Sequence, residues 1–297
     1  MASWSASDIP DQSGRVVLVT GANSGLGLHT SLELARRGAR VLMACRDPKR
    51  ADAALQRVTA EVPSATVELV PLDLASLSSV RAAAADVAER TERLDVLVNN
   101  AGVMAIPSRT TTADGFEMQL GTNHLGHFAL TGLVLPLMTG PDARVVTVSS
   151  EAAKIGRIQF DDLQGENKYG RWSAYGQSKL ANLLFMRELG RRAPSVISAS
   201  AHPGYAATNL QSAPGLRGLI MNLGNKVLAQ SDADGAWPQQ YAATMPGVKT
   251  GDYFGPSGLF GQRGAPHKIT PRAAAQDDAV AARLWDVSQQ LTGVTYP

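Results

Sequence analysis

The sequence predicts an α/β fold in which a doubly wound parallel sheet carries helices on both faces. Short runs rich in β-branched residues alternate with helical stretches from Arg15 to about Ala201. The first of these runs, at 16–19, is apolar throughout, as is typical of a strand covered on both faces. Strands joined by helical segments pair in parallel through right-handed crossovers. We expect a polar segment at 1–13 and one domain over 14–297, because no linker or internal repeat divides the chain.

Local patterns predict each element in the first half of the chain. The expected strands are four largely apolar runs at 16–19, 41–44, 67–70 and 95–98. The helix after the first strand begins at about Gly25 and ends at Gly38, because glycine lets the chain leave the helix. Asp47 and Pro48 open the next helix as its N-cap and first-turn proline. Further helices are expected over 79–88 and around 114–138.

The second half of the chain continues this alternation. Strands are expected at 145–148 and 196–201, joined by a helix over 175–191. The region 205–250 is punctuated by glycine and proline and contains an apolar helical stretch. It is a candidate substrate lid, although the stretch could equally pack on the core. The last expected elements are a short strand at 253–254 and a helix over 277–291 that ends at Gly293.

Composition argues against several classes of protein. The 28 Lys and Arg and 26 Asp and Glu give a formal net charge of +2, without the basic stripe of a nucleic-acid or membrane-surface protein. No apolar run approaches the roughly 18 residues of a spanning helix, and the N-terminus lacks the pattern of a secretion signal. The single cysteine, Cys45, cannot form an internal disulfide, which suits a reducing compartment. The expected location is cytoplasmic.

A glycine-rich loop over 20–27 lies between the first strand and the first helix. Its glycines permit a tight turn and let a pyrophosphate approach the free N–H groups of the helix N-terminus. This context predicts a Rossmann-type dinucleotide site, although a structural turn could show the same glycines. The expected cofactor contacts in the loop are Gly21, Asn23, Ser24, Gly25, Leu26 and Gly27. A serine hydrolase is disfavoured, because no G-x-S-x-G turn occurs.

The end of the second strand indicates which dinucleotide is bound. An acidic residue there would bind the ribose hydroxyls of NAD, whereas a basic one favours the 2′-phosphate of NADP. The chain has Arg46, whose guanidinium can bind a phosphate in bidentate fashion, and Asp47 is assigned to helix capping. NADP(H) is therefore favoured. NAD(H) is the alternative if Arg46 is only a solvated surface residue.

Six motifs follow one another in a fixed order along the chain. They are T-G-A-N-S-G-L-G at 20–27, N-N-A-G at 99–102, Asn123, the serine pair at 149–150, Y-G-Q-S-K at 175–179, and Pro203-Gly204. Together they resemble the classical short-chain dehydrogenase/reductase family over about 14–209. The resemblance implies hydride transfer between a nicotinamide and a carbonyl or alcohol.

Further features resemble one branch of that family. They are the 25 residues from Ser150 to Tyr175, the run S-K-L-A-N-L-L-F at 178–185, and His202-Pro203-Gly204. These features are similar to the retinol dehydrogenase-like branch, which includes WW-domain oxidoreductases. A homodimer or homotetramer would be in keeping with the family, although the long segment before Tyr175 could alter the helices that form it.

Tyr175 and Lys179, four apart on one face of a helix, form the centre of the expected catalytic set. A phenol has a pKa near 10, and a neighbouring ammonium is expected to lower it toward a working range. Ser150, at the carboxyl end of a strand, can donate a hydrogen bond to the same substrate oxygen. The resemblance implies these roles and prefers Ser150 to Ser149. It adds Asn123 as the support of a proton-relay water and Lys179 as a ligand of the nicotinamide ribose.

Other cofactor contacts follow from matched positions in the family. The resemblance assigns Asp73 and Leu74 to the adenine ring and places Asn100 and Gly102 beside the adenosine ribose. It assigns Pro203, Gly204 and Thr208 to the nicotinamide carboxamide, and Ala101 is a further expected cofactor contact. Asp73 could instead be only a helix cap.

The expected partner is a small carbonyl or alcohol substrate of lipophilic character, because the candidate lid is rich in leucine. Two other functions stay open: a catalytically silent NADP-binding regulator, and an extended-type enzyme that modifies nucleotide sugars. The regulator would not need the proton-transfer set, and the extended type favours a different glycine spacing. His124 and His127 lie three apart but lack an obvious third ligand, so no metal is expected.

Overall fold

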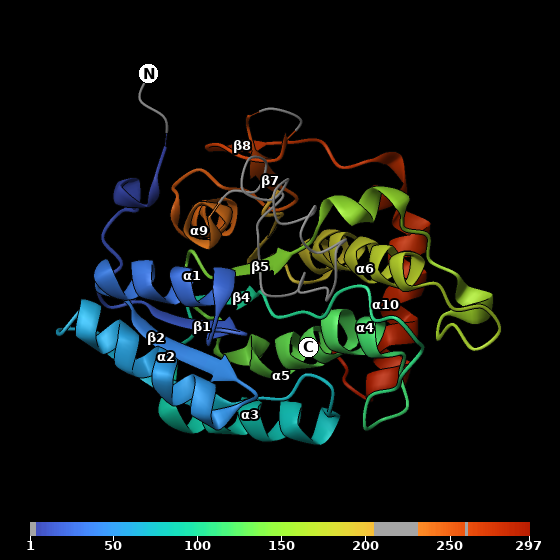
Figure 1. The fold of residues 1–297 in the computed structure, drawn as a ribbon, viewed down its shortest axis with the longest axis horizontal. Helices are drawn as coiled ribbons and strands as arrows, with labels where there is room; N and C mark the ends of the chain where they lie inside the picture. Colours follow the sequence, from blue (N-terminus) through green and yellow to red (C-terminus); the bar gives the residue numbers. More distant parts are fainter. Residues whose placement is uncertain (1–3, 205–230, 259–260) are drawn as a thin grey trace, which may run out of the picture.

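The computed structural model of the chain describes residues 4–204, 231–258 and 261–297 (Figure 1). Its centre is an eight-stranded sheet in the order β3-β2-β1-β4-β5-β6-β7-β8. Neighbours from β3 to β7 are parallel, and β8 pairs antiparallel with β7 at the edge. The strands are β1 (Val16–Thr20), β2 (Arg40–Cys45), β3 (Thr66–Pro71), β4 (Val96–Asn99), β5 (Arg144–Val148), β6 (Ile197–Ala201), β7 (Tyr253–Pro256) and β8 (Pro266–Lys268).

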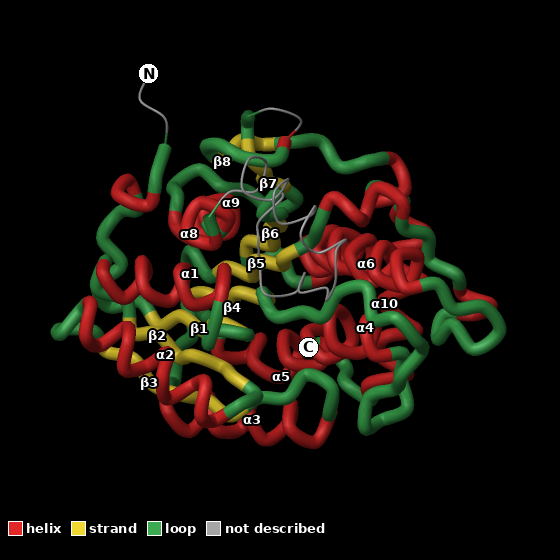
Figure 2. Tube along the Cα trace, in the orientation of Figure 1, coloured by secondary structure: helices red, strands yellow, loops and turns green. Residues whose placement is uncertain are grey.

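Helices cover both faces of this sheet, as Figures 1 and 2 show. One face carries α1 (Gly25–Arg36), α2 (Pro48–Glu61) and α9 (Trp237–Thr244), which follows the short α8 (Asp232–Gly235). The other carries α3 (Leu77–Arg90), α5 (Gly126–Val134), α6 (Arg171–Arg192) and α10 (Asp278–Thr292). The other helical elements of the described residues are short: η1 (Ala6–Asp8), α4 (Met118–Leu120), η2 (Gly121–Leu125), η3 (Leu135–Leu137), η4 (Glu151–Ile155), η5 (Phe160–Asp162) and η8 (Ala273–Ala275).

Alternating side chains of each strand join the two helical layers to the sheet. In β1, Val17 and Val19 pack with the layer of α1, α2 and α9, whereas Leu18 packs with the layer of α3 and α5. All three are buried, as expected for a strand between two helical layers. This arrangement confirms the predicted doubly wound α/β fold, with its parallel sheet and helices on both faces.

The predicted helix around 114–138 is divided in the structure. Glu117 accepts backbone hydrogen bonds from Gln119 and Leu120 and so caps a helix that begins at Met118. The chain then passes through a π-helical turn, η2, before it continues as α5. The start at Asp114 is therefore wrong, and that carboxylate instead accepts the N–H of Leu77 at the start of α3.

Three further parts of the chain differ from the expectation. α6 begins four residues before Tyr175, because Gly170 takes the N-cap position. β8 was not expected, since Pro266–Lys268 is too short and too polar to show a strand pattern. The turn-rich region at 231–250 contains α8 and α9, and Ala242 and Ala243 of α9 are fully buried against the sheet.

Two predicted segments, the candidate lid at 205–250 and the polar N-terminal segment at 1–13, are only partly within the described residues. The apolar stretch of the candidate lid, within 205–230, lies outside the described residues. The described part of the polar N-terminal segment contacts the domain: Ile9 is buried, and the ring of Trp4 packs edge-on against Trp237 and Tyr241. Among the helices of the described ranges, none combines the length and apolar character that crossing a bilayer requires.

Candidate active site

The glycine-rich loop joins β1 to α1 and leaves space where side chains would otherwise stand. Gly21 and Gly25 have φ values of +65° and +53°, a region that favours glycine. A Cβ at Gly27 would lie 2.4 Å from the carbonyl oxygen of Gly21, so this approach of α1 to the loop requires glycine. The donor-rich N-terminus of α1 is therefore open to an anion, which fits a dinucleotide pyrophosphate.

A cavity of about 390 Å³ extends from this loop along the carboxyl ends of β2, β3 and β4. The carboxyl ends of parallel strands are where such folds bind ligands. Of the expected cofactor contacts, those that line this cavity are Gly21, Asn23, Ser24, Gly25, Leu26, Gly27, Arg46, Asp73, Leu74, Asn100, Ala101 and Gly102. The structure thus gathers residues from four separate segments around one space.

Two arginines stand at the β2 end of this cavity. Arg46 lines it as expected, and Arg50, one turn into α2, lines it as well. Asp47 accepts the backbone N–H of Arg50 and so caps α2, as predicted. Asp73 accepts the N–H of Ala75. The sequence reasoning missed Arg50, which the helix start at Pro48 could have indicated.

The loop after β4 is tied to the first residue of the glycine-rich loop. Thr20 Oγ1 accepts the backbone N–H groups of Asn100, at 2.9 Å, and of Ala101, at 3.0 Å. The side-chain amide of Asn100 donates to the carbonyl oxygen of Thr20 at 2.7 Å. These bonds hold the two loops of the cavity at a fixed separation.

A second cavity, of about 250 Å³, adjoins the first, and Leu26, Asn100, Gly102 and Val103 line both. The expected residues on its wall are Ser150, Tyr175, Lys179, Pro203 and Gly204. Thr208, the last expected carboxamide contact, lies outside the described residues. The two cavities together form a continuous candidate site for a dinucleotide and a small substrate.

Helix α6 presents Tyr175 and Lys179 to this cavity from one face. Lys179 Nζ lies 5.9 Å from the centre of the Tyr175 ring. Ser150, which follows the end of β5, lines the same cavity as Tyr175. Ser149 also lines this cavity, but its Oγ donates to the backbone carbonyl of Lys179 at 2.7 Å. This difference supports the choice of Ser150 over Ser149.

The pKa values of the two groups reflect their burial. Burial lowers the pKa of the Lys179 ammonium to about 8. Burial also raises the pKa of the Tyr175 phenol, and the Ser150 hydroxyl opposes that shift. The expected lowering of the Tyr175 pKa by Lys179 is therefore not found, because desolvation is the largest cause and only Ser150 opposes it. The phenol is protonated at neutral pH.

Asn123 lies behind Lys179 in the π-helical turn η2. Its side chain accepts the N–H of Val103 at 2.8 Å and donates to the carbonyl oxygen of Val103 and to Ser178 Oγ, both at 2.9 Å. A Cβ at Gly102 would lie 3.0 Å from Asn123 Oδ1 and 3.4 Å from Lys179 Nζ. Asn123 is therefore a fully hydrogen-bonded support beside the lysine, and within the described part of the chain it lines neither cavity.

The two histidines of this region have separate partners. His124 Nε2 lies 2.9 Å from Ser288 Oγ of α10, whereas His127 Nε2 lies 2.8 Å from Thr20 Oγ1 of β1. Burial lowers the pKa of His124 to about 3 and that of His127 to about 4, so both rings are neutral. The two histidines therefore contact two different elements, α10 and β1.

Comparison with known proteins gives the family. The family model described as short chain dehydrogenase matches residues 15–215. The chain belongs to the short-chain dehydrogenase family. Retinol dehydrogenase 14 of Mus musculus is 42% identical to this dehydrogenase over 95% of the chain and 86% of the relative. Retinol dehydrogenase 13 of Homo sapiens is 43% identical over 96% and 86%.

Solved structures agree with this family. An uncharacterized protein from Mycobacterium Paratuberculosis has a TM-score of 0.82 and 45% identity, and covers all of both chains. The RhlG/NADP active-site complex of Pseudomonas aeruginosa has a TM-score of 0.65 and 25% identity over 82% of this chain and 94% of that one. The dehydrogenase is therefore an oxidoreductase that uses a nicotinamide cofactor and interconverts alcohols and carbonyls.

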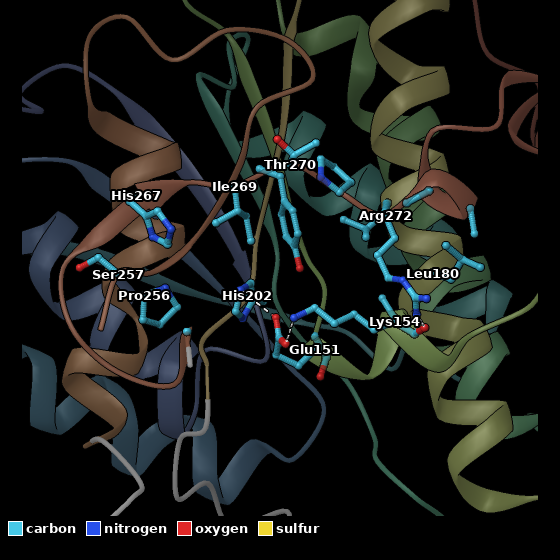
Figure 3. Close-up of a pocket in the computed structure, with 18 of the residues that line it drawn as sticks. Glu151, Lys154, Leu180, His202, Pro256, Ser257, His267, Ile269, Thr270 and Arg272 are labelled. Atoms are coloured by element: carbon cyan, nitrogen blue, oxygen red, sulfur yellow. Dashed lines mark hydrogen bonds and ion pairs between the residues drawn. The ribbon is translucent and has the colours of Figure 1, made fainter. Parts of the chain in front are cut away.

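A third cavity of the dehydrogenase, of about 300 Å³, also reaches Ser150 and Glu151 and is lined further by Leu180, Leu183, Tyr253 and Ile269, among others. Figure 3 shows Glu151 at its edge between His202 and Lys154. His202 Nδ1 accepts the N–H of Gly204 at 3.1 Å, so its Nε2 carries the proton and faces Glu151 Oε1 at 3.3 Å. This pair connects the Pro203-Gly204 turn to the segment after Ser150.

Glu151 and Trp172 are among the residues on the wall of the Tyr175 cavity of the dehydrogenase that sequence reasoning missed. Glu151 follows the serine pair directly, and Trp172 lies one turn before Tyr175 on α6. Trp172 is 48% exposed, and its ring lies edge-on to Tyr175 at 6.2 Å between centres. The start of α6 could have indicated Trp172, because residues three apart share one face of a helix.

Proposed function

We propose that the chain reduces lipophilic carbonyls, or oxidises the corresponding alcohols, with Tyr175 as the general acid and base and NADP(H) as the preferred cofactor. The observation that carries this proposal is that Tyr175, Ser150 and Lys179 share the wall of a cavity next to the glycine-rich loop. A buried phenol that keeps its proton at neutral pH suits the donation of that proton to a substrate oxygen.

Each residue of the proposed site has a separate role in the reaction, set by its position. When bound, the nicotinamide supplies or accepts the hydride at the substrate carbon. Tyr175 gives its proton to the carbonyl oxygen during reduction and takes it back during oxidation, while Ser150 hydrogen-bonds to the same oxygen. Lys179 binds the nicotinamide ribose and stabilises the phenolate that remains. The carboxamide is bound by Pro203, Gly204 and Thr208. Asn123 supports the proton-relay water beside Lys179.

The cofactor preference rests on the two arginines at the end of β2 and the start of α2. Both line the cavity, and the nearby Asp47 is engaged in capping the helix. A doubly charged phosphate beside two guanidinium groups gains charge-assisted hydrogen bonds that a ribose hydroxyl does not offer. The preference for NADP(H) over NAD(H) follows from that difference.

Arg46→Asp is expected to weaken NADPH binding relative to NADH by about 10- to 100-fold, because it removes a charge-assisted hydrogen bond and adds a repelling charge. The ratio of the two dissociation constants measures the change. Lys49→Asp is the matched control, since Lys49 is exposed at the start of the same helix and does not line the cavity. An unchanged ratio in Arg46→Asp would rule out Arg46 as the selector.

The substrate class follows from the walls around Tyr175. Val103, Met104, Val148 and Trp172 give this cavity a largely apolar lining. Relatives of the chain are named retinol dehydrogenases, which agrees with a lipophilic carbonyl or alcohol. The exposed indole of Trp172 offers a flat apolar surface next to the reactive hydroxyl, which suits a flat, apolar substrate.

Trp172→Ala is expected to raise KM for an aromatic aldehyde about 10-fold while kcat changes little, because the indole binds the substrate rather than the transition state alone. Steady-state kinetics with an aromatic and a short aliphatic aldehyde measure this effect. Ile155→Ala is the control, since Ile155 is 64% exposed but lies off the cavity wall. Equal KM changes for both aldehydes would contradict the role of Trp172.

One experiment separates this proposal from its alternatives. A panel of carbonyls, alcohols and nucleotide sugars is followed at the nicotinamide absorbance with both cofactors. A silent regulator would bind NADP without turning over any member, and an extended-type enzyme would act on the nucleotide sugars. The lid over 205–250, a cytoplasmic location and a homodimer or homotetramer stay predictions, which limited proteolysis, fractionation and light scattering would test.

A further inference from the structure

His127 belongs to a buried hydrogen-bonded chain that joins the glycine-rich loop to Asn123. The chain runs from Thr20 Oγ1 to His127 Nε2, at 2.8 Å, and from His127 Nδ1 to the backbone oxygen of Asn123, at 3.0 Å. Thr20, His127 and Asn123 are at most 1% exposed. Solvent therefore does not compete for these bonds, and each one must be satisfied within the protein.

The direction of each bond follows from the partners of Thr20. Its Oγ1 accepts the N–H groups of Asn100 and Ala101, so its own hydrogen must point to another acceptor. His127 Nε2 at 2.8 Å is the closer acceptor, since the carbonyl oxygen of Val98 lies at 3.3 Å. Nε2 then has no proton, and a neutral ring carries it on Nδ1. The Nδ1–H group donates to Asn123, whose backbone oxygen can only accept.

The ring stays in this neutral form at physiological pH. Burial, with a further contribution from the charge of Lys179, lowers the pKa of His127 to about 4. Because the donor side and the acceptor side are both engaged, rotating or flipping the ring would break both bonds. The imidazole is thus a rigid two-ended link rather than a titrating group.

This link meets the candidate catalytic set at the π-helical turn η2, which contains Asn123. The π-helical turn η2 displaces the normal helical hydrogen bonds around Asn123, so the direction of its carbonyl is not fixed by the helix alone. The side chain of Asn123 is held by Val103 and Ser178, and Gly102 stands between Asn123 Oδ1 and Lys179 Nζ. The hydrogen bond from His127 Nδ1 holds the backbone carbonyl of Asn123.

We propose that His127 is a positioning residue: in its Nδ1–H form it orients the Asn123 carbonyl beside Lys179 and locks that orientation to the glycine-rich loop through Thr20. The inference rests on the proposed function, because Asn123 and Lys179 matter only in that reaction. A histidine that merely fills space would not need a particular proton position.

The proton position can be measured without any variant. Nitrogen-15 chemical shifts of the histidine rings in the intact protein distinguish a protonated Nδ1 from a protonated Nε2. We expect a protonated Nδ1 and a bare Nε2 for His127 across pH 6 to 8. The reverse form, or a ring that takes up a second proton in that range, would overturn the proposal.

A matched pair of variants tests the consequence for catalysis. The amide of His127→Asn falls near the Nδ1 position and keeps the donor to Asn123, whereas that of His127→Gln falls near Nε2 and keeps only the Thr20 side. Each loses one buried hydrogen bond, so similar losses of thermal stability are expected. With NADPH and 4-nitrobenzaldehyde as probe, kcat of His127→Gln is expected about tenfold below that of His127→Asn, while both keep NADPH affinity within about threefold.

The outcomes separate this inference from the proposed function. Equal kcat values for the two variants would overturn the positioning role, because packing alone does not distinguish the ends of the ring. A tenfold difference in kcat without a matching difference in thermal stability supports it. If the wild-type protein reduced no carbonyl, the proposed function would fall, and the nitrogen-15 shifts would still decide the orientation of the ring.

Discussion

Replacing Tyr175 with phenylalanine is expected to lower turnover about 100- to 10,000-fold, the usual contribution of a positioned general acid. The ring keeps its place on α6, since the phenol is buried and only its oxygen is removed. NADP(H) affinity should stay within about threefold, because the glycine-rich loop and Arg46 are untouched. Single-turnover absorbance at the nicotinamide band measures the chemical step, and fluorescence titration measures cofactor binding.

Tyr169→Phe is the matched control for this variant. Tyr169 donates to the carbonyl oxygen of Ile106 and accepts from the side chain of Gln119, and it does not line the Tyr175 cavity. Its loss removes hydrogen bonds of similar kind without touching the proposed proton path. If Tyr175→Phe kept near-normal turnover, or if both variants lost turnover equally, Tyr175 would not be the proton donor.

Prediction from the sequence succeeded for features that depend only on residues close together along the chain. Strands such as β1 need only a continuous apolar run, and Asp47 and Gly293 mark helix ends through their own side chain or lack of one. The glycine-rich loop was predictable for the same reason, because its backbone geometry depends on Gly21, Gly25 and Gly27 themselves. Family membership then agreed with the order of the motifs.

Features that depend on distant contacts were not predictable. The π-helical turn η2 has no sequence period of its own, and β8 is held only by its pairing with β7. The role of His127 depends on Thr20, 107 positions away along the chain. The pKa of Tyr175 was expected to fall because Lys179 is near, but the degree of burial that raises it appears only in the folded chain.

Lys179→Met is expected to remove most turnover and, at the same time, to stabilise the fold at neutral pH. Lys179 is only 4% exposed, and this burial lowers the pKa of its ammonium. A fall from 10.5 to about 8 corresponds to roughly 3 kcal/mol that the charged form costs in the folded state. Methionine fills similar space without that cost. A rise in Tm of several degrees with loss of turnover is the expected pair of results.

The pH dependence of the Tm difference distinguishes this cause from better packing. Below pH 8 the folded and unfolded chains are both charged at Lys179, so the wild-type protein bears the full cost and the variant has its largest advantage. Between pH 8 and 10.5 the folded wild-type protein loses its proton before the unfolded chain does, so the advantage shrinks and then disappears. Lys168→Met, at an exposed lysine, should show no such trend. A Tm advantage for Lys179→Met that stayed constant from pH 7 to 10.5 would mean that packing, and not the buried charge, is responsible.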